Sequence, residues 1–130
     1  MTKFLQTVKF SGMNNTGTIG EIVCALSQQG LNFTIDVLNQ KCSDSDKFIT
    51  FFEVKVKRDQ DIMNWSRPYL EGNELRDSVL DAISILNNKW DNNNMDYVKI
   101  EFRYAEDVDT FYLDGKHDVV EEICIMLEDG

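Results

Sequence analysis

The chain is short of the residues on which most catalytic and metal sites depend. Its 130 residues include one histidine and three cysteines. The cysteines form no CxxC pair, so the sequence indicates neither a zinc site nor a disulfide framework. No GxSxG, HExxH, Walker or dinucleotide-binding glycine pattern is present. His117 is either a base oriented by Asp118 or an exposed loop histidine, and we favour the second. We therefore expect no catalytic residue, no metal, no cofactor and no enzymatic activity.

Long hydrophobic runs are also absent. No stretch approaches the roughly 18 to 20 apolar residues that span a bilayer, so we expect an unprocessed cytoplasmic protein with reduced thiols. Cys24 and Cys124 lie inside apolar runs, where cysteine usually behaves as a small buried hydrophobe. At 42% hydrophobic residues, a chain of this length forms one domain around one core.

Positive charge is scarce near the carboxyl end. Residues 91–130 carry 12 acids against 3 lysines and arginines, whereas residues 1–90 carry 11 acids against 10. A concentrated acidic surface repels nucleic acid and anionic membranes, and it attracts basic proteins. The charge distribution therefore predicts a basic protein as partner, and it excludes nucleic acid and membranes.

Hydrophobic periodicity predicts strands that alternate with helices. We expect strands at 4–10, 31–37, 48–57 and 98–104, and helices at 18–30 and 73–90. The order βαββαβ, with two helices on one face of an antiparallel sheet, is the ferredoxin-like arrangement. The prediction is an α+β single domain over 1–130. It consists of a ferredoxin-like core at 1–104 and an acidic carboxyl-terminal extension at 105–130.

Helix ends and core positions follow from the same pattern. Thr18 and Glu21 have the spacing of a capping box, Asn73 is placed to cap the second helix, and Gly30 stands where a left-handed residue ends a helix. The residues expected to be buried between the sheet and the helices are Ile22, Leu26, Phe33, Ile35, Val54, Ile83, Leu86 and Ile100.

The segment after residue 105 is open to two interpretations. Asp114-Gly115 is a two-residue hairpin signal, while a helical stripe is formed by Val119, Val120, Ile123 and Leu127. We favour a terminal helix.

The motifs Val8–Gly12, Gly17–Ile22, Leu26 and Gly30–Phe33 form a glycine turn, a helix and the entry to a second strand. This succession resembles the opening of an ACT domain, a small regulatory βαββαβ module, over residues 8–58. The resemblance implies a regulatory function in which a small amino acid binds at a dimer interface near Gly17 and Asn32.

In size, acidity and lack of catalytic groups, the whole chain resembles the immunity proteins of interbacterial nuclease toxins, such as those of contact-dependent growth inhibition. The resemblance implies a protein that binds and neutralises a basic nuclease toxin domain. Interface centres are apolar and rimmed by charge, so we expect Phe111 and Tyr112 to form an anchor among acids, although residues 111–113 also fit a buried strand. The predicted partner-binding residues are Asp107, Asp109, Phe111, Tyr112, Asp114, Glu101, Glu121 and Glu122.

Overall fold

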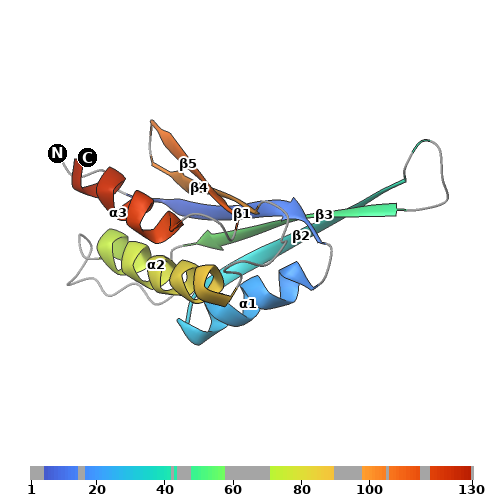
Figure 1. The fold of residues 1–130 in the computed structure, drawn as a ribbon, viewed down its shortest axis with the longest axis horizontal. Helices are drawn as coiled ribbons and strands as arrows, with labels where there is room; N and C mark the ends of the chain where they lie inside the picture. Colours follow the sequence, from blue (N-terminus) through green and yellow to red (C-terminus); the bar gives the residue numbers. More distant parts are fainter. Residues whose placement is uncertain are drawn as a thin grey trace.

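A computed structural model describes residues 5–14, 17–41, 43, 48–57, 71–89, 98–104, 106–114 and 118–129. Its elements are β1 (Thr7–Met13), α1 (Thr18–Gln28), β2 (Asn32–Lys41), β3 (Phe48–Lys57), α2 (Glu71–Lys89), β4 (Val98–Arg103), β5 (Val108–Leu113) and α3 (Val119–Asp129). The five strands form one antiparallel sheet in the order β2-β3-β1-β4-β5. The three helices cover one face of it (Figure 1). The predicted α+β class is confirmed.

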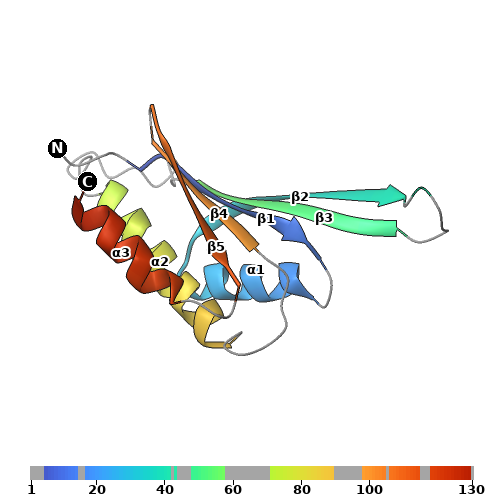
Figure 2. The ribbon, with the colours of Figure 1, turned by 45° about the horizontal axis from the view of Figure 1, so that its top comes forward.

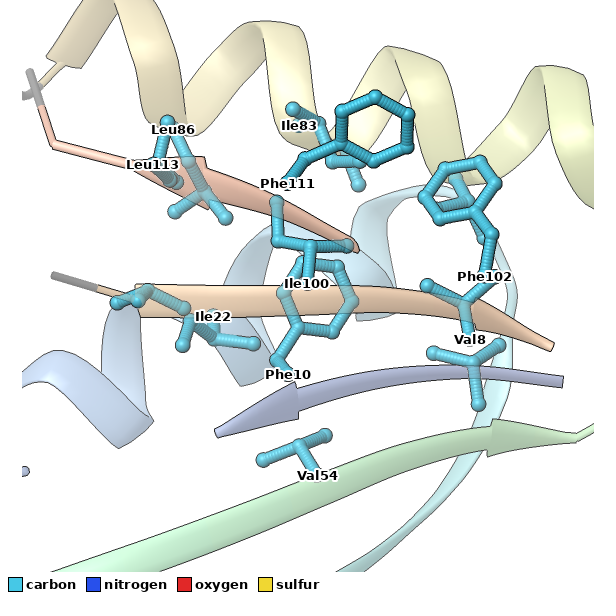
Figure 3. Close-up of a cluster of buried hydrophobic side chains, with 14 of the residues drawn as sticks. Val8, Phe10, Ile22, Val54, Ile83, Leu86, Ile100, Phe102, Phe111 and Leu113 are labelled. Atoms are coloured by element: carbon cyan, nitrogen blue, oxygen red, sulfur yellow. The ribbon is translucent and has the colours of Figure 1, made fainter. Parts of the chain in front are cut away.

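The register between strands decides which side chains face the helices. Phe10 of β1 lies opposite Val54 of β3 and Ile100 of β4, and Ile100 lies opposite Phe111 of β5. All four are buried, and they pack toward the helices together with residues such as Ile83 of α2 (Figure 3). Because side chains alternate along a strand, the neighbouring positions point to the opposite, open face of the sheet.

Most of the predicted core is confirmed. Six of the eight predicted residues lie on helices or inner strands and are buried, namely Ile22, Leu26, Val54, Ile83, Leu86 and Ile100. Phe33 is partly buried against the core, but Ile35 is 42% exposed, so its prediction is wrong. The physical reason is its position on β2, an edge strand of the sheet with no strand on its outer side. The far end of the β2–β3 hairpin extends beyond the helices (Figures 1 and 2).

The predicted capping box at the start of α1 is not formed. Gly17 takes the N-cap position with a φ of 76°, so the chain is already helical at Thr18. Thr18 is buried. The backbone N–H of Ile19 donates a hydrogen bond to Asn14 Oδ1 at 3.1 Å. Asn14 therefore satisfies one of the first backbone donors of the helix. The Glu21 N–H, which a capping box assigns to the Thr18 hydroxyl, instead donates to the carbonyl oxygen of Gly17 at 3.1 Å.

Other boundary predictions have mixed outcomes. Gly30 has a φ of 70°, the left-handed conformation predicted for it. The second helix begins at Glu71, two residues before Asn73, so the prediction that Asn73 caps it is wrong. Cys24 and Cys124 are exposed, because an apolar run does not decide which helix face a residue occupies. His117 lies outside the described residues.

The segment after residue 105 belongs to the same sheet and core rather than to an extension. β5 pairs with β4 along its full length. Phe111 and Leu113 of β5 are buried, as are Val119 and Ile123 of α3. The favoured terminal helix is confirmed, and β5 is an additional strand at the sheet edge.

Candidate functional site

The open face of the sheet carries charged residues in cross-strand rows. Lys9 of β1 lies opposite Lys55 of β3 and Glu101 of β4. One row further along, Ser11 of β1 lies opposite Glu53 of β3. These polar positions are the other half of the alternation that buries the core, so the strand pattern that builds the core also builds this surface.

Glu101 is the centre of an ion-pair network on this face. Its side chain is 11% exposed, and its carboxylate lies 3.3 Å from Lys9 Nζ, 3.3 Å from Arg103 Nη2 and 4.0 Å from Lys99 Nζ. Glu53 approaches Lys9 from the other side at 3.5 Å. Glu101 was predicted to contact a basic partner, but the cations of its own sheet already neutralise its charge.

Two adjoining grooves lie on the open face. A polar groove of about 330 Å³ is lined by Lys9, Thr34, Asp36, Glu53, Lys55 and Arg103. A groove of about 580 Å³ shares Asp36 and Glu53 with it and has an apolar lining from Leu38 and Phe51, with Lys99 at its other side. Grooves of this size match those that hold small ligands. No local sequence pattern predicts these grooves, because they combine residues from strands far apart in the chain.

The helices carry an excess of acids, whereas the strands do not. Within their bounds, the three helices contain nine acidic residues against two basic ones, and the five strands contain six basic residues against four acidic ones. Both basic residues of the helices are paired with helix acids. The exposed helix acids that form no ion pair with any residue in the described part of the chain are Asp81, Glu121 and Glu122.

Helix α3 exposes apolar side chains beside these acids. Ile125 is 54% exposed and Met126 is 47% exposed, while Ile123 on the opposite side of the helix is buried. Glu121 and Glu122 precede them by four residues, and residues four apart share one helix face. The outer surface of α3 therefore has an apolar centre with carboxylates next to it, the composition of many protein interfaces.

The structure distributes the predicted partner-binding residues over several places. Glu101 and Tyr112 lie on the open sheet face, Asp107 and Asp109 near the β4–β5 turn, Asp114 after β5, Glu121 and Glu122 on α3, and Phe111 in the core. No single acidic patch unites the eight residues.

The predicted aromatic anchor is divided between the two faces of β5. Phe111 is 2% exposed and packs edge-on against Phe102, with ring centroids 5.6 Å apart. Tyr112, the next residue, is 53% exposed. Because adjacent strand residues point in opposite directions, only Tyr112 of the two lies at the surface. Ile125 and Met126 of α3 were not predicted, although their position off the 119–123–127 helical stripe is a signal for exposure.

Asp109 has a structural partner in Tyr104. Tyr104 is 8% exposed, and its burial, followed by the charge of Asp109 and a hydrogen bond with it, raises the pKa of the phenol to about 12. The backbone N–H of Tyr104 also donates to the carbonyl oxygen of Asp107 at 2.9 Å. Both acids thus help to hold the β4–β5 turn.

Two further features concern the described residues as a group. Among them, no three histidine, cysteine, aspartate or glutamate side chains gather as a metal-binding group. In the same part of the chain, no helix is long and apolar enough to cross a membrane.

Comparisons with known proteins leave the family of the chain open. No protein family model matches it, and no curated protein matches it. Among solved structures, a phage SAM lyase in complex with S-methyl-5'-thioadenosine is similar with a TM-score of 0.44 and 10% sequence identity, over 85% of this chain and 91% of that chain. A likeness at that TM-score supports no inference about the activity or ligand of this chain.

Proposed function

We propose that this chain is a small acidic binding protein that attaches to a basic nuclease domain through helix α3 and neutralises it. The observation that carries the proposal is the outer surface of α3. Ile125 and Met126 are exposed there, with the carboxylates of Glu121 and Glu122 one helical turn away. Apolar anchors surrounded by charged residues supply most of the affinity in protein interfaces.

The charge of the helices favours a basic partner. Carboxylates that become buried against a neutral or acidic surface lose hydration without a compensating ion pair. A basic surface instead supplies counter-charges and accelerates encounter. Nucleases have basic clefts because they bind phosphates, and the immunity proteins that this chain resembles in size and acidity act on such enzymes.

The test uses purified ribonuclease and deoxyribonuclease domains with basic surfaces. Nuclease activity is measured with one equivalent of the full chain, and association is followed by surface plasmon resonance at several salt concentrations. We expect inhibition of a domain whose association rate falls with ionic strength while its dissociation rate changes little. Failure of every domain to bind at low salt would contradict the proposal.

Variants locate the contact. Ile125→Ala is expected to weaken binding by about 1 to 2 kcal/mol, mainly through faster dissociation. The double variant Glu121→Gln/Glu122→Gln is expected to slow association. Glu53→Gln, which removes a charge from the open sheet face, is the matched control and leaves binding unchanged. Equal losses in the control and the α3 variants would place the contact elsewhere.

The strand order and the positions of the grooves also bear on the finer fold assignment and on the ACT-like alternative. We infer that the strand order β2-β3-β1-β4 with α1 and α2 is a ferredoxin-like unit to which β5 and α3 are added. The ACT-like alternative requires an amino-acid site near Gly17 and Asn32. Neither residue lines the two grooves described above, so the α3 surface supports the binding-protein proposal better.

A further inference from the structure

We propose that the two adjoining grooves on the open sheet face bind a small zwitterion with a large apolar group, of the size and chemistry of phenylalanine or leucine. This site is separate from the α3 surface, because the helices lie on the other face of the sheet (Figure 2). It does not depend on the identity of the protein partner.

The order of side chains along β3 carries the inference. Every second residue of β3 points to the open face, and three of them line the grooves in the order Lys55, a cation, Glu53, a carboxylate, and Phe51, an apolar side chain. Strands rise about 3.4 Å per residue, so these three bands are about 6.8 Å apart. The partners on β2 repeat the order as a hydroxyl, a carboxylate and an apolar group, in Thr34, Asp36 and Leu38.

Two of the groove charges are available to a ligand. Lys9 and Arg103 are held by Glu101, and Glu53 is held by Lys9. By contrast, Lys55 and Asp36 form no ion pair with any residue that the structure describes. The polar groove therefore keeps one cation for a ligand anion and one carboxylate for a ligand cation, on diagonally adjacent positions of β3 and β2.

The third band provides for an apolar group. Leu38 is 63% exposed and lies opposite Phe51 in the apolar part of the larger groove. Covering these side chains removes apolar surface from water, which favours binding in proportion to the area covered. A ligand that satisfies all three bands has a carboxylate near Lys55, an ammonium group near Asp36 and an apolar side chain over Leu38.

The experiment is isothermal titration calorimetry on the full chain with three probes that share a phenyl ring. L-Phenylalanine carries both charges, 3-phenylpropanoate lacks the ammonium group, and phenethylamine lacks the carboxylate. We expect L-phenylalanine to bind about tenfold or more tightly than either analogue, because each lacks one charge-assisted hydrogen bond. Equal affinities for the three probes, or no binding of L-phenylalanine at about 10 mM, a concentration at which even millimolar affinity saturates the site, would overturn the proposal.

Two substitutions assign the charges to their partners. Asp36→Asn is expected to remove the preference for L-phenylalanine over 3-phenylpropanoate. Lys55→Met is expected to remove the preference for L-phenylalanine over phenethylamine. Asp36 lies on β2 and Lys55 on β3, both on the open face of the sheet. Circular dichroism verifies that the variants are folded. Glu121→Gln on α3 is the control and keeps all three affinities. Unchanged preferences in both groove variants would refute the assignment.

Discussion

Two isoleucines on α3 provide a test of how the carboxyl-terminal segment is held. Ile123 is fully buried, whereas Ile125, two residues away, is 54% exposed. Truncation to alanine removes three carbon atoms at either position, worth about 2.4 kcal/mol of transfer free energy when the side chain is fully buried. At Ile123 the cavity left behind adds to this amount, for a total of about 2 to 5 kcal/mol. At Ile125 about half of the transfer free energy is at stake, so we expect a loss of about 1 kcal/mol or less.

Urea unfolding followed by circular dichroism measures both variants. The free energy of unfolding comes from linear extrapolation, with an unchanged dependence on urea as evidence that the unfolded state is the same. The gain in helix propensity from isoleucine to alanine is equal at the two positions and cancels in the comparison. Similar losses at both positions would refute the packing of α3 described above, and losses near zero at both would make residues 119–129 a peripheral extension.

Two further predictions concern ionisable groups. The pKa of Tyr104 is raised from 10.0 to about 12. The contribution of the neutral phenol to the free energy of unfolding is therefore fully present below pH 10 and is lost as the pH rises through 12. Thermal unfolding of Tyr104→Phe should depend less on pH between 10 and 12 than that of the unaltered chain. Glu101→Gln leaves three cations without their shared carboxylate, and urea unfolding should show a loss of about 1 to 3 kcal/mol. Glu53→Gln, whose carboxylate is 54% exposed, should lose about 0.5 kcal/mol or less, and equal losses would contradict the central position of Glu101.

Element positions were predictable because the side-chain period of a strand or helix is a local property. Phe10 and Ile100 alternate with Lys9 and Glu101 along their strands. That alternation alone assigns the two apolar residues to one sheet face and the two charged residues to the other. Ile35 shows the limit of this reasoning. Its strand has the correct period, but burial also requires an element to cover it, and the local pattern does not specify that β2 is an edge strand.

The binding surfaces depend on relations that local patterns do not contain. The grooves exist because β1 lies between β3 and β4, which brings Lys9 next to both Lys55 and Glu101. The expected anchor of Phe111 and Tyr112 meets a simpler limit. Adjacent residues of a strand point to opposite faces, so Phe111 occupies the buried strand position that the sequence also allowed, and Tyr112 is exposed.

The charge count along the chain also changes meaning once the strands are placed. Lys99 and Arg103 come from the acidic segment 91–130, yet they lie on the open sheet face around Glu101. The carboxylates of that segment without such partners include Glu121 and Glu122 of α3. Within the helices and strands, the excess of acids therefore lies on the helices, and the sheet face has a mixed surface. A basic protein is attracted to the first surface and a zwitterion to the second, so saturating L-phenylalanine should leave the association rate at α3 unchanged.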